Sequence, residues 1–457
     1  ATQNGQITFR AQSEIKDFVL QQRSTTTVPT VNPAANPWTP VWNEANLRVI
    51  ANGTYDPTTD KLTLAGAEAN GEGVTLVAGG NLTQLTATPQ ADIRGEIGYD
   101  LSVLTTKLRP SLGPNVRLTG NKKAQFVVAG PLLASSVSVT PVQPQVVNAY
   151  GQPGVQQTAA NVPSTTALLS PDLHGEAGLG WDSIEAFGIS MGPQDISTRL
   201  QQGTLFFSPL QTSVGGGQVH LAPRIEFNAS PMTLALDEGS IEQVQITPEM
   251  FQTWFKYIAP LLANAATAEG QLSVALNQVR VPLEQPMGSS LAGKVVIHGA
   301  RVEAGPMAQQ VLGVVREVST LLTRSGPKLD FLNAGETWME IAPQDIDFQM
   351  ANGRVYHRNL ELRAGKVPIR TQGWVGVDQT VGMMAEIPVQ NDWIEGRKLL
   401  EGLRGQTIQI PVHGTFAKPQ LERGAIAKLS QQLIGNTAER LIHQELQKGL
   451  QKLLGPR

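Results

Sequence analysis

Apolar and polar residues alternate along most of this chain, which is typical of β-strands that bury one face. The alternation is clear at 61–64, 74–76, 224–227, 232–236, 345–350 and 365–369. Asn-Gly pairs at 52–53, 70–71 and 352–353 predict hairpin turns, because Asn and Gly tolerate positive φ. Hairpins join antiparallel neighbours. Strands and helices do not alternate regularly, which argues against a parallel α/β sheet.

Helical spacing is confined to a few segments. They are 12–23, 247–268, 306–323, 392–403 and 424–454. The second begins with Thr247 as a cap, Pro248 at the first helical position and Glu249 in the first turn, and Pro260 interrupts it. Segments 24–40 and 141–166 lack a regular pattern and are predicted to be long loops or linkers.

A loose repeat runs through these elements, because a short helical piece precedes an alternating strand three times. The pairs are 99–112 with 123–129, 247–268 with 270–276, and 392–403 with 406–416. Such a repeat favours an extended, open-ended sheet over one closed globule. The fold class predicted is therefore mainly β with a few helices, built on an elongated antiparallel sheet.

We divide the chain into four segments. They are a strand, helix and Pro/Thr-rich loop at 1–45, an antiparallel β region at 46–245 with a loop near 141–166, a second β region with interspersed helices at 246–421, and a C-terminal amphipathic helix at 422–457. Length alone would allow about two to four domains.

The strand predicted at 406–416 carries Ile408, Ile410, Val412 and Phe416 on one side and mostly polar residues on the other. Its apolar side has two possible uses: it packs a protein core, or it contacts something that is not protein.

The composition of the chain excludes several classes of function. The chain has 457 residues, no Cys, 16% charged residues and a net charge of −3. Disulfides, thiol catalysis and thiolate metal sites are therefore excluded, and no basic footprint indicates nucleic-acid binding. No apolar run is long enough to span a membrane, and no signal peptide is present. Because the chain starts without Met and enters a strand directly, we expect the C-terminal portion of a longer protein or one whose targeting region was removed.

Residues with catalytic potential are sparse. Gly188-Ile-Ser190-Met-Gly192 matches G-x-S-x-G, but a nucleophile elbow needs a helix after the Ser, and a turn and strand follow here. The six His residues show no metal-ligand spacing, and Asp345 and Asp347 are best explained as outward-facing acids. Gly215 to Gly217 lack the helix and Lys of a phosphate loop. We expect no catalytic residue, no metal and no cofactor.

The last helix carries an apolar stripe and six Arg and Lys against two Glu from Arg423 onward. Its capping or membrane-contacting candidates are Leu429, Leu433, Leu441, Leu446 and Leu450. Such a helix either docks on the sheet or lies on an anionic membrane surface. Its Gly residues and modest charge excess favour docking.

The segment Ile410-Pro-Val-His-Gly-Thr-Phe-Ala-Lys-Pro-Gln-Leu421, before a terminal amphipathic helix, resembles the C-terminal region of AsmA-like proteins of the bacterial envelope. Supporting stretches lie at 246–262, 347–357 and 385–389. The resemblance covers most of the chain after Asn46, and its motifs concern fold rather than catalysis.

The resemblance implies a strongly curved sheet, open along one side like a taco shell, that conducts phospholipid acyl chains in the manner of bridge-like lipid transfer proteins. The groove candidates are Ile346, Phe348, Met350, Val367, Ile369, Ile408, Ile410, Val412 and Phe416. The implied location is the periplasmic side of the cell envelope, with a membrane anchor in the full-length protein, a phospholipid or other acyl-chain lipid as partner, and no identified protein partner.

Two alternatives remain. In one, the chain is a structural or assembly scaffold whose apolar sheet face is filled by its own helices. In the other, it is a hydrolase that uses Ser190. The geometry of the face carrying Ile408, Ile410 and Val412 separates the scaffold from the lipid conductor, because an open face can bind lipid and a filled one cannot.

Overall fold

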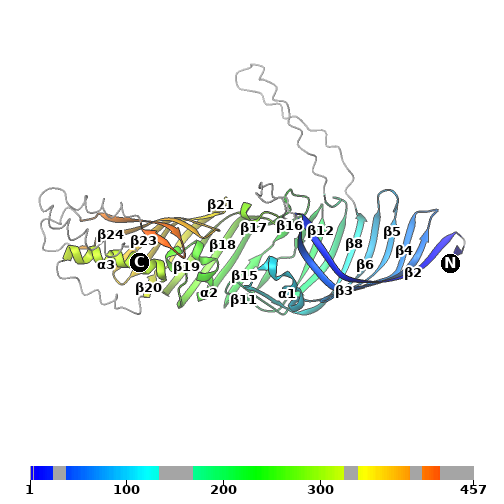
Figure 1. Ribbon diagram of the computed structural model, residues 1–457, viewed down its shortest axis with the longest axis horizontal. Helices are drawn as coiled ribbons and strands as arrows, with labels where there is room; N and C mark the ends of the chain where they lie inside the picture. Colours follow the sequence, from blue (N-terminus) through cyan, green and yellow to red (C-terminus); the bar gives the residue numbers. More distant parts are fainter. Residues whose placement is uncertain are drawn as a thin grey trace, which may run out of the picture.

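The computed structural model describes residues 2–3, 5–23, 38–132, 168–323, 338–391 and 404–421. Every strand in these ranges belongs to one sheet, and all its strand pairs are antiparallel (Figure 1). The strands lie side by side along the long axis of the molecule. The predicted class, mainly β with an extended antiparallel sheet, is confirmed.

The N-terminal part of the sheet is a simple meander. Its strands are β1 (Thr2–Gln3), β2 (Gln6–Arg23), β3 (Trp38–Asp56), β4 (Lys61–Asn70), β5 (Val74–Thr83), β6 (Gln90–Asp100), β7 (Val116–Thr119) and β8 (Asn121–Pro131), with helix α1 (Leu101–Leu112) after β6. Consecutive strands pair from β1 to β6, and β6 then pairs with β8.

The middle of the sheet consists of two branches of short strands. They are β9 (His174–Trp181), β10 (Ser183–Ala186), β11 (Ile189–Met191), β12 (Gln194–Gln201), β13 (Thr204–Phe207), β14 (Leu210–Val214), β15 (Gly217–Leu221) and β16 (Arg224–Glu226). One branch pairs in the order β8, β9, β12, β13, β16, and the other in the order β7, β10, β11, β14, β15. Both branches end on the long strand β17 (Thr233–Gln245).

The C-terminal part combines long strands with the remaining helices. Its elements are α2 (Pro248–Gln252), the 3₁₀ turns η1 (Phe255–Tyr257), η2 (Pro260–Leu262) and η3 (Pro286–Gly288), β18 (Ala268–Pro282), β19 (Ser290–Glu303), α3 (Pro306–Thr323), β20 (Trp338–Ile341), β21 (Gln344–Ala351), β22 (Arg354–Ala364), β23 (Val367–Gly376), β24 (Thr380–Pro388), β25 (Thr407–Thr415) and β26 (Pro419–Leu421). The sheet continues from β19 through β21 to β26, and β20 pairs with β19 and β22.

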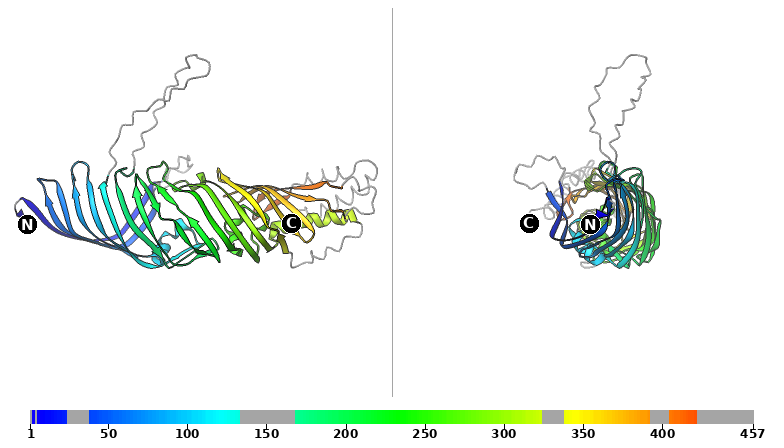
Figure 2. Two further views of the ribbon diagram at one scale, coloured as in Figure 1. Left: turned by 180° about the vertical axis from the view of Figure 1, so that it is seen from behind. Right: turned by 90° about the vertical axis from the view of Figure 1, so that its right-hand side faces the viewer.

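The sheet is not flat. Viewed along its long axis, it curls around that axis (Figure 2). Strand twist causes part of this curvature, and β-bulges increase it locally. Pairing shifts register at several places, including Leu64/Ala67 in β4, Ile241/Val244 in β17 and His357/Leu360 in β22.

Several predicted elements are confirmed. The helix predicted at 306–323 is α3 with the same bounds, and the Asn-Gly pairs at 70–71 and 352–353 lie at hairpin turns. Asn352 and Gly353 have φ of 51° and 70°, which is the conformation that such turns require. The helix expected at 99–112 is α1, and Asp100 accepts hydrogen bonds from the N–H groups of Ser102 and Val103 at its start.

Two predictions were wrong. The segment 12–23 is part of β2 and not a helix. The sequence pattern was misleading because Asp17, with φ of 52°, interrupts the alternation and gives the apolar residues around it a helix-like spacing. Asn52 and Gly53 lie within β3 instead of at a hairpin, at a register shift against β4. The absent side chain at Gly53 leaves room for the Thr63 carbonyl of β4 and the ring of Phe9.

The segment 247–268 is shorter in helix than predicted. It contains α2, η1 and η2, separated at Thr253 and before Pro260. Thr247 precedes α2 as expected, but its hydroxyl makes no capping hydrogen bond and instead donates to the carbonyl of Gly188 at 3.2 Å. The segment is therefore held by tertiary contacts with the β10–β11 turn and by its apolar side chains.

The first three proposed segments share one sheet in the described ranges, and the fourth, 422–457, lies outside the described residues. The boundary at 45/46 falls inside β3, and β17 ends at Gln245, next to the boundary at 245/246. The segments predicted as helices at 392–403 and 424–454 lie outside the described residues, apart from the flanking positions.

Candidate functional site

The groove candidates of the C-terminal half are core residues in the structure. Eight of the nine are at most 8% exposed, and Met350 is partly buried against the same cluster. The buried eight are Ile346, Phe348, Val367, Ile369, Ile408, Ile410, Val412 and Phe416. They do not line an open surface, so the expectation of an open face at these positions is corrected.

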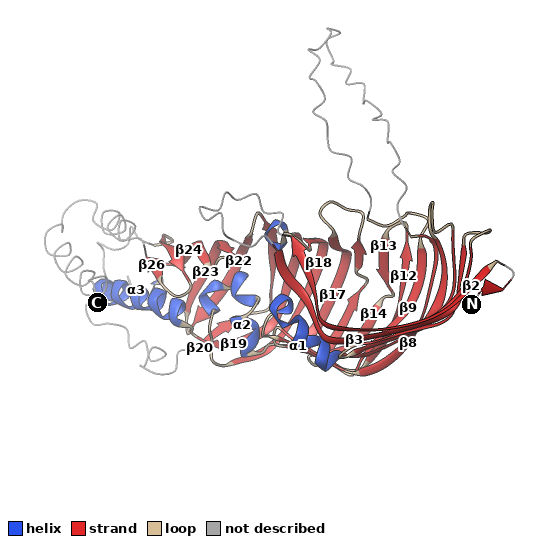
Figure 3. Cartoon of the chain, turned by 45° about the vertical axis from the view of Figure 1, so that its right-hand side comes forward, coloured by secondary structure: helices blue, strands red, loops and turns tan. Residues whose placement is uncertain are grey.

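The chain's own helices fill this face. Met250, Phe251, Phe255, Leu261 and Leu262 are fully buried and belong to one apolar cluster with the strand residues. At its far end, the ring of Tyr257 meets that of Phe416 edge-on, with 6.3 Å between the centroids. Figure 3 shows α2 and α3 over this half of the sheet.

Helix α3 covers a further part of the same core. Met307, Ala308, Val311, Leu312 and Val314 are each at most 3% exposed and join the cluster. Gly305, just before the helix, lies against the Ala263 carbonyl so closely that a Cβ would clash at 2.2 Å. The helix is therefore seated against η2 as well as against the sheet.

The filled region contains the buried polar side chains of His357 and Thr371. His357 is 1% exposed, its Nε2 lies 3.3 Å from the Thr371 hydroxyl, and its Nδ1 has no hydrogen-bond partner. Burial lowers the pKa of His357 to about 4, because the apolar surroundings disfavour the charged imidazolium. The side chain is thus neutral at neutral pH.

The N-terminal half has an apolar face of a different kind. Residues joined by cross-strand pairing share one face of a sheet, so the pairs trace rows across it. One row crosses twelve strands and every member is apolar or Gly. Its members are Phe9, Gly53, Leu64, Gly80, Ile93, Val128, Gly175, Leu200, Leu205, Ile225, Leu234 and Val281.

Parallel rows extend the same face. One consists of Ala11, Ala51, Ala67, Ala78, Gly95, Phe126, Ala177, Thr198 and Phe207. A third consists of Ser13, Val49, Ala69, Leu76, Ile97 and Ala124, and a fourth of Ile7, Tyr55, Leu62, Leu82, Ala91 and Gly130. We call these four rows the N-terminal apolar face.

Helices do not fill the N-terminal apolar face within the described part of the chain. None of its residues belongs to the core cluster, which starts at Val214, and the large side chains of its longest row are half-buried. In Figure 3 the part of the sheet that carries β8, β9, β12 and β13 has no described helix in front of it.

Small residues set the contour of this face. Ala or Gly occupies five successive positions of the second row, from Ala11 to Gly95, and Gly53, Gly80 and Gly175 interrupt the first. The ring of Phe126 lies over Gly95, where a Cβ would come within 3.0 Å of it, and the ring of Phe9 lies over Gly53 in the same way. The two aromatic rings thus lie over glycine positions of neighbouring strands, and the short Ala side chains of the second row leave space above the sheet.

The opposite face of these strands is mostly polar, although Val77, Val127 and Phe206 are exposed on it. Arg94, Glu176 and Arg199 lie on cross-strand positions one residue away from the apolar row, and Arg199 pairs with Glu176 at 3.4 Å. Glu96 pairs with Lys123 at 3.1 Å on the same face. The N-terminal half is therefore amphipathic, with one apolar face and one face on which charged residues predominate.

A buried ionic contact ties α1 to the start of β3. The Glu44 side chain is 4% exposed and lies 3.1 Å from Lys107 Nζ on α1, which also binds Glu72 at 2.9 Å. Burial acts to raise the pKa of Glu44, but hydrogen bonds from the Glu72 N–H, Lys107 and Trp42 outweigh it and hold the pKa below its ordinary value. The helix is thereby fixed beside the N-terminal strands.

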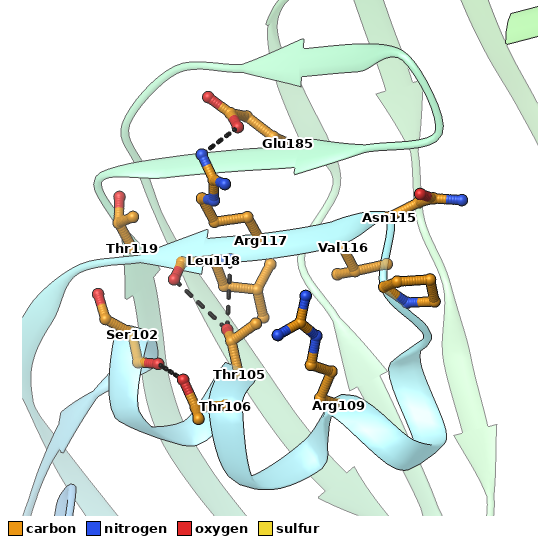
Figure 4. Close-up of a pocket in the computed structure, with 11 residues that line it drawn as sticks. Ser102, Thr105, Thr106, Arg109, Asn115, Val116, Arg117, Leu118, Thr119 and Glu185 are labelled. Carbon is orange, nitrogen blue, oxygen red and sulfur yellow. Dashed lines mark hydrogen bonds and ion pairs between the residues drawn. The ribbon is translucent and has the colours of Figure 1, made fainter. Parts of the chain in front are cut away.

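A pocket of about 460 Å³ lies between α1 and β7 (Figure 4). Arg109 of α1 points toward β7, whereas Arg117 of β7 points away to Glu185, with which it pairs at 3.4 Å. The Thr105 hydroxyl donates to the carbonyls of Leu101 and Leu118. The pocket is polar and shares no residue with the N-terminal apolar face.

Among the described residues, the hydrogen bonds and ion pairs of the structure link no acid or base to the Ser190 hydroxyl. Ser190 is exposed on β11, and strand β12 follows it, so the strand–turn–helix geometry of a nucleophile elbow is absent here. Among the described residues no cluster of His, Asp and Glu fits a metal ion, and no helix there is long and apolar enough to cross a membrane. Asp345 pairs with Lys294 at 3.0 Å on the exposed side of β21.

The candidates Leu429, Leu433, Leu441, Leu446 and Leu450 lie outside the described residues, so the choice between docking and membrane contact stays a prediction. No protein-family model, no curated protein and no solved structure matches the chain. The resemblance to AsmA-like proteins likewise stays a prediction.

Proposed function

We propose that this protein binds and conducts phospholipid acyl chains along the N-terminal apolar face, without catalysis. The observation that carries the proposal is the row from Phe9 to Val281, which is apolar or Gly on twelve strands that are neighbours in the sheet and whose large side chains are half-buried. Exposed apolar surface costs about 25 cal/mol per Å² in water. An acyl chain laid along the rows would remove its own apolar surface and that of the sheet from water.

A uniform row also supports movement. Each strand presents a similar set of aliphatic and small side chains, so an acyl chain gains comparable contact at each position and meets no deep specific site. The Ala and Gly positions leave space next to the sheet, and the charged face on the opposite side stays in water. The filled C-terminal half would then be one end of the lipid-binding surface.

The cellular setting belongs to the same proposal. We place the protein on the periplasmic side of the bacterial envelope, where it would support lipid homeostasis of the outer membrane and attach to a membrane in its full-length form. Only the resemblance to AsmA-like proteins, which covers most of the chain after Asn46, supports this placement.

A structural or assembly scaffold is the second candidate function. The filled core of the C-terminal half favours it, because there the chain's own helices occupy the face that lipid would need. It predicts that the whole protein binds no lipid.

Site-specific photo-crosslinking tests the proposal. A benzophenone amino acid would replace Ile93 on the apolar face or Arg94, its neighbour on the charged face, in protein incubated with phosphatidylglycerol vesicles that carry a radiolabelled lipid. We expect labelling at 93 to exceed that at 94 at least tenfold. Equal labelling at the two positions, or none at 93 together with no phospholipid in native mass spectrometry, would reject lipid binding and leave the scaffold.

A further inference from the structure

The pocket between α1 and β7 lies in a stretch of the chain that is basic and contains no acid. Residues 101–131 have no Asp or Glu, and they have five basic residues: Lys107, Arg109, Arg117, Lys122 and Lys123. The counter-charges of this stretch therefore come from other parts of the chain. Four of the five basic residues receive one, in the pairs Lys107 with Glu44, Arg117 with Glu185, Lys122 with Asp182 and Lys123 with Glu96.

Arg109 is the exception. Within the described residues its guanidinium forms no ion pair, and it points from the last turn of α1 toward β7 (Figure 4). It lines the pocket together with Ser102, whose hydroxyl makes no hydrogen bond to the described part of the chain. Val116 and Leu118 line the pocket from β7. The pocket therefore offers a free cation and a free hydroxyl beside a partly apolar wall.

The charges and the size of the pocket favour a small anion-bearing ligand. The lining holds two Arg and one Glu, and Glu185 is already paired with Arg117 at 3.4 Å, so the positive charge of Arg109 is left over. A planar guanidinium with free N–H groups binds the oxygens of an anion such as phosphate in a bidentate manner. The volume of about 460 Å³ lies within the range of about 300–1,000 Å³ that small-molecule pockets occupy.

We propose that this pocket binds a phosphate group through Arg109 and Ser102. A phosphate presents several oxygens, so it can accept from the guanidinium and from the hydroxyl at once. The headgroup of a phospholipid on the N-terminal apolar face would supply the group, and this part rests on the proposed function. Ile97, in the third row of that face, lies four residues before the first residue of α1. A soluble phosphate would use the same two donors without the apolar face.

Two lipids that differ in the phosphate alone test the proposal. Dioleoyl phosphatidic acid and dioleoylglycerol, carrying the same fluorescent label, would be offered to the full chain in neutral detergent micelles. We expect phosphatidic acid to bind about tenfold more tightly, because hydrogen bonds between a guanidinium and an anion are charge-assisted. Arg109→Gln should remove this preference and leave dioleoylglycerol binding unchanged. Arg117→Gln is the matched control, since Arg117 lines the same pocket but points away to Glu185.

Inorganic phosphate separates the pocket from the apolar face. Its binding would be followed by the broadening of its ³¹P NMR line, and circular dichroism would check the fold of each variant. Broadening that Arg109→Gln abolishes and Arg117→Gln retains, without binding of either lipid, would support the pocket, assign it to a soluble phosphate and reject the proposed function. Equal binding of the two lipids by the wild type, with no broadening, would overturn the pocket and leave lipid binding intact.

Two further outcomes would overturn the pocket. An equal loss in Arg109→Gln and Arg117→Gln would show that the general positive charge of the region attracts the anion. Binding of neither lipid and no broadening would show that Arg109 is a solvated surface charge, and it would reject the proposed function as well.

Discussion

Ile93 and Ile410 hold similar positions in two distant parts of the sheet. Each lies in the middle of an alternating strand, with apolar or small cross-strand neighbours. Ile410 is 1% exposed under the chain's own helices, whereas Ile93 is half-buried in a region where no described helix joins the strands in a core. The same local pattern thus serves a protein core in one half and, in the other, an apolar face that no described helix covers.

The difference shows what a strand pattern leaves open. Alternation specifies that one face avoids water, but either helices of the chain or an external apolar molecule can satisfy it. Phe251, Phe255 and Leu261 satisfy it in the C-terminal half. The rows of the N-terminal half, by contrast, contain many Ala and Gly, and no described helix covers them.

The largest effect is expected from the same charge placed in each half. Ile410→Asp buries a carboxylate without a partner and should cost at least about 4 kcal/mol, enough to unfold the C-terminal half. Ile93→Asp should leave the circular dichroism spectrum intact and reduce lipid uptake at least fivefold. Loss of fold in both variants, or in neither, would show that the two halves do not differ as described.

Truncation of a large ring gives a graded version of this comparison. Phe255→Ala removes a fully buried side chain and should lower the free energy of unfolding by about 3–5 kcal/mol. Phe126→Ala removes a half-buried ring and should cost about 1–1.5 kcal/mol. Urea denaturation measures both. A larger loss for Phe126 would indicate that the N-terminal face is packed after all.

Acid should weaken the filled half selectively. Because burial lowers the pKa of His357 from an ordinary 6.5 to about 4, the unfolded chain binds a proton at this residue more readily than the folded chain. The contribution of neutral His357 to the free energy of unfolding is therefore complete above pH 6.5, and it falls by about 3 kcal/mol as the pH drops to about 4. Urea titrations at pH 7 and pH 4.5 measure this difference in the free energy of unfolding, and His357→Leu should abolish the part that comes from the His. The same difference in the variant and the wild type would contradict the prediction.

A small effect is expected at the contact between α1 and β3. Lys107→Met removes the cation that pairs with buried Glu44 and should lower stability by about 1–2 kcal/mol. Hydrogen exchange should rise in α1 and at the start of β3 and stay unchanged in β21–β25. The change Lys123→Met, at an exposed ion pair of the N-terminal half, is the matched control and should cost less than about 0.5 kcal/mol.

Much of the fold could be predicted locally. Alternation identified strands in both halves, and the spacing of apolar residues in 306–323 predicted α3 with its bounds. Predictions failed where one backbone torsion changed the pattern, as at Asp17 in β2, or where Gly served a close approach instead of a turn, as at Gly53.

The site was predicted less well. Each groove candidate was chosen for its position in an alternating strand, and this property does not show whether a helix covers it. The rows of the N-terminal half were missed because their weakest members, such as Ala51, Ala67 and Gly95, carry little hydrophobic signal. Segment 61–98 did contain a pattern that could have indicated these rows, because Ala, Gly and large aliphatic residues occupy the alternate positions of its successive strands.

By itself, the sequence determined that this chain forms antiparallel strands with one face shielded from water, since a period of two and the scarcity of charged residues leave no other way to bury its aliphatic side chains. Only the tertiary structure decided which stretch of that face is filled. Register places Phe9, Ile93 and Val281 in one row although 272 positions separate the first from the last, and the path of the chain sets α2 and α3 over the C-terminal strands. These are long-range choices, because they depend on which strands and helices meet and not on the residues within any one of them.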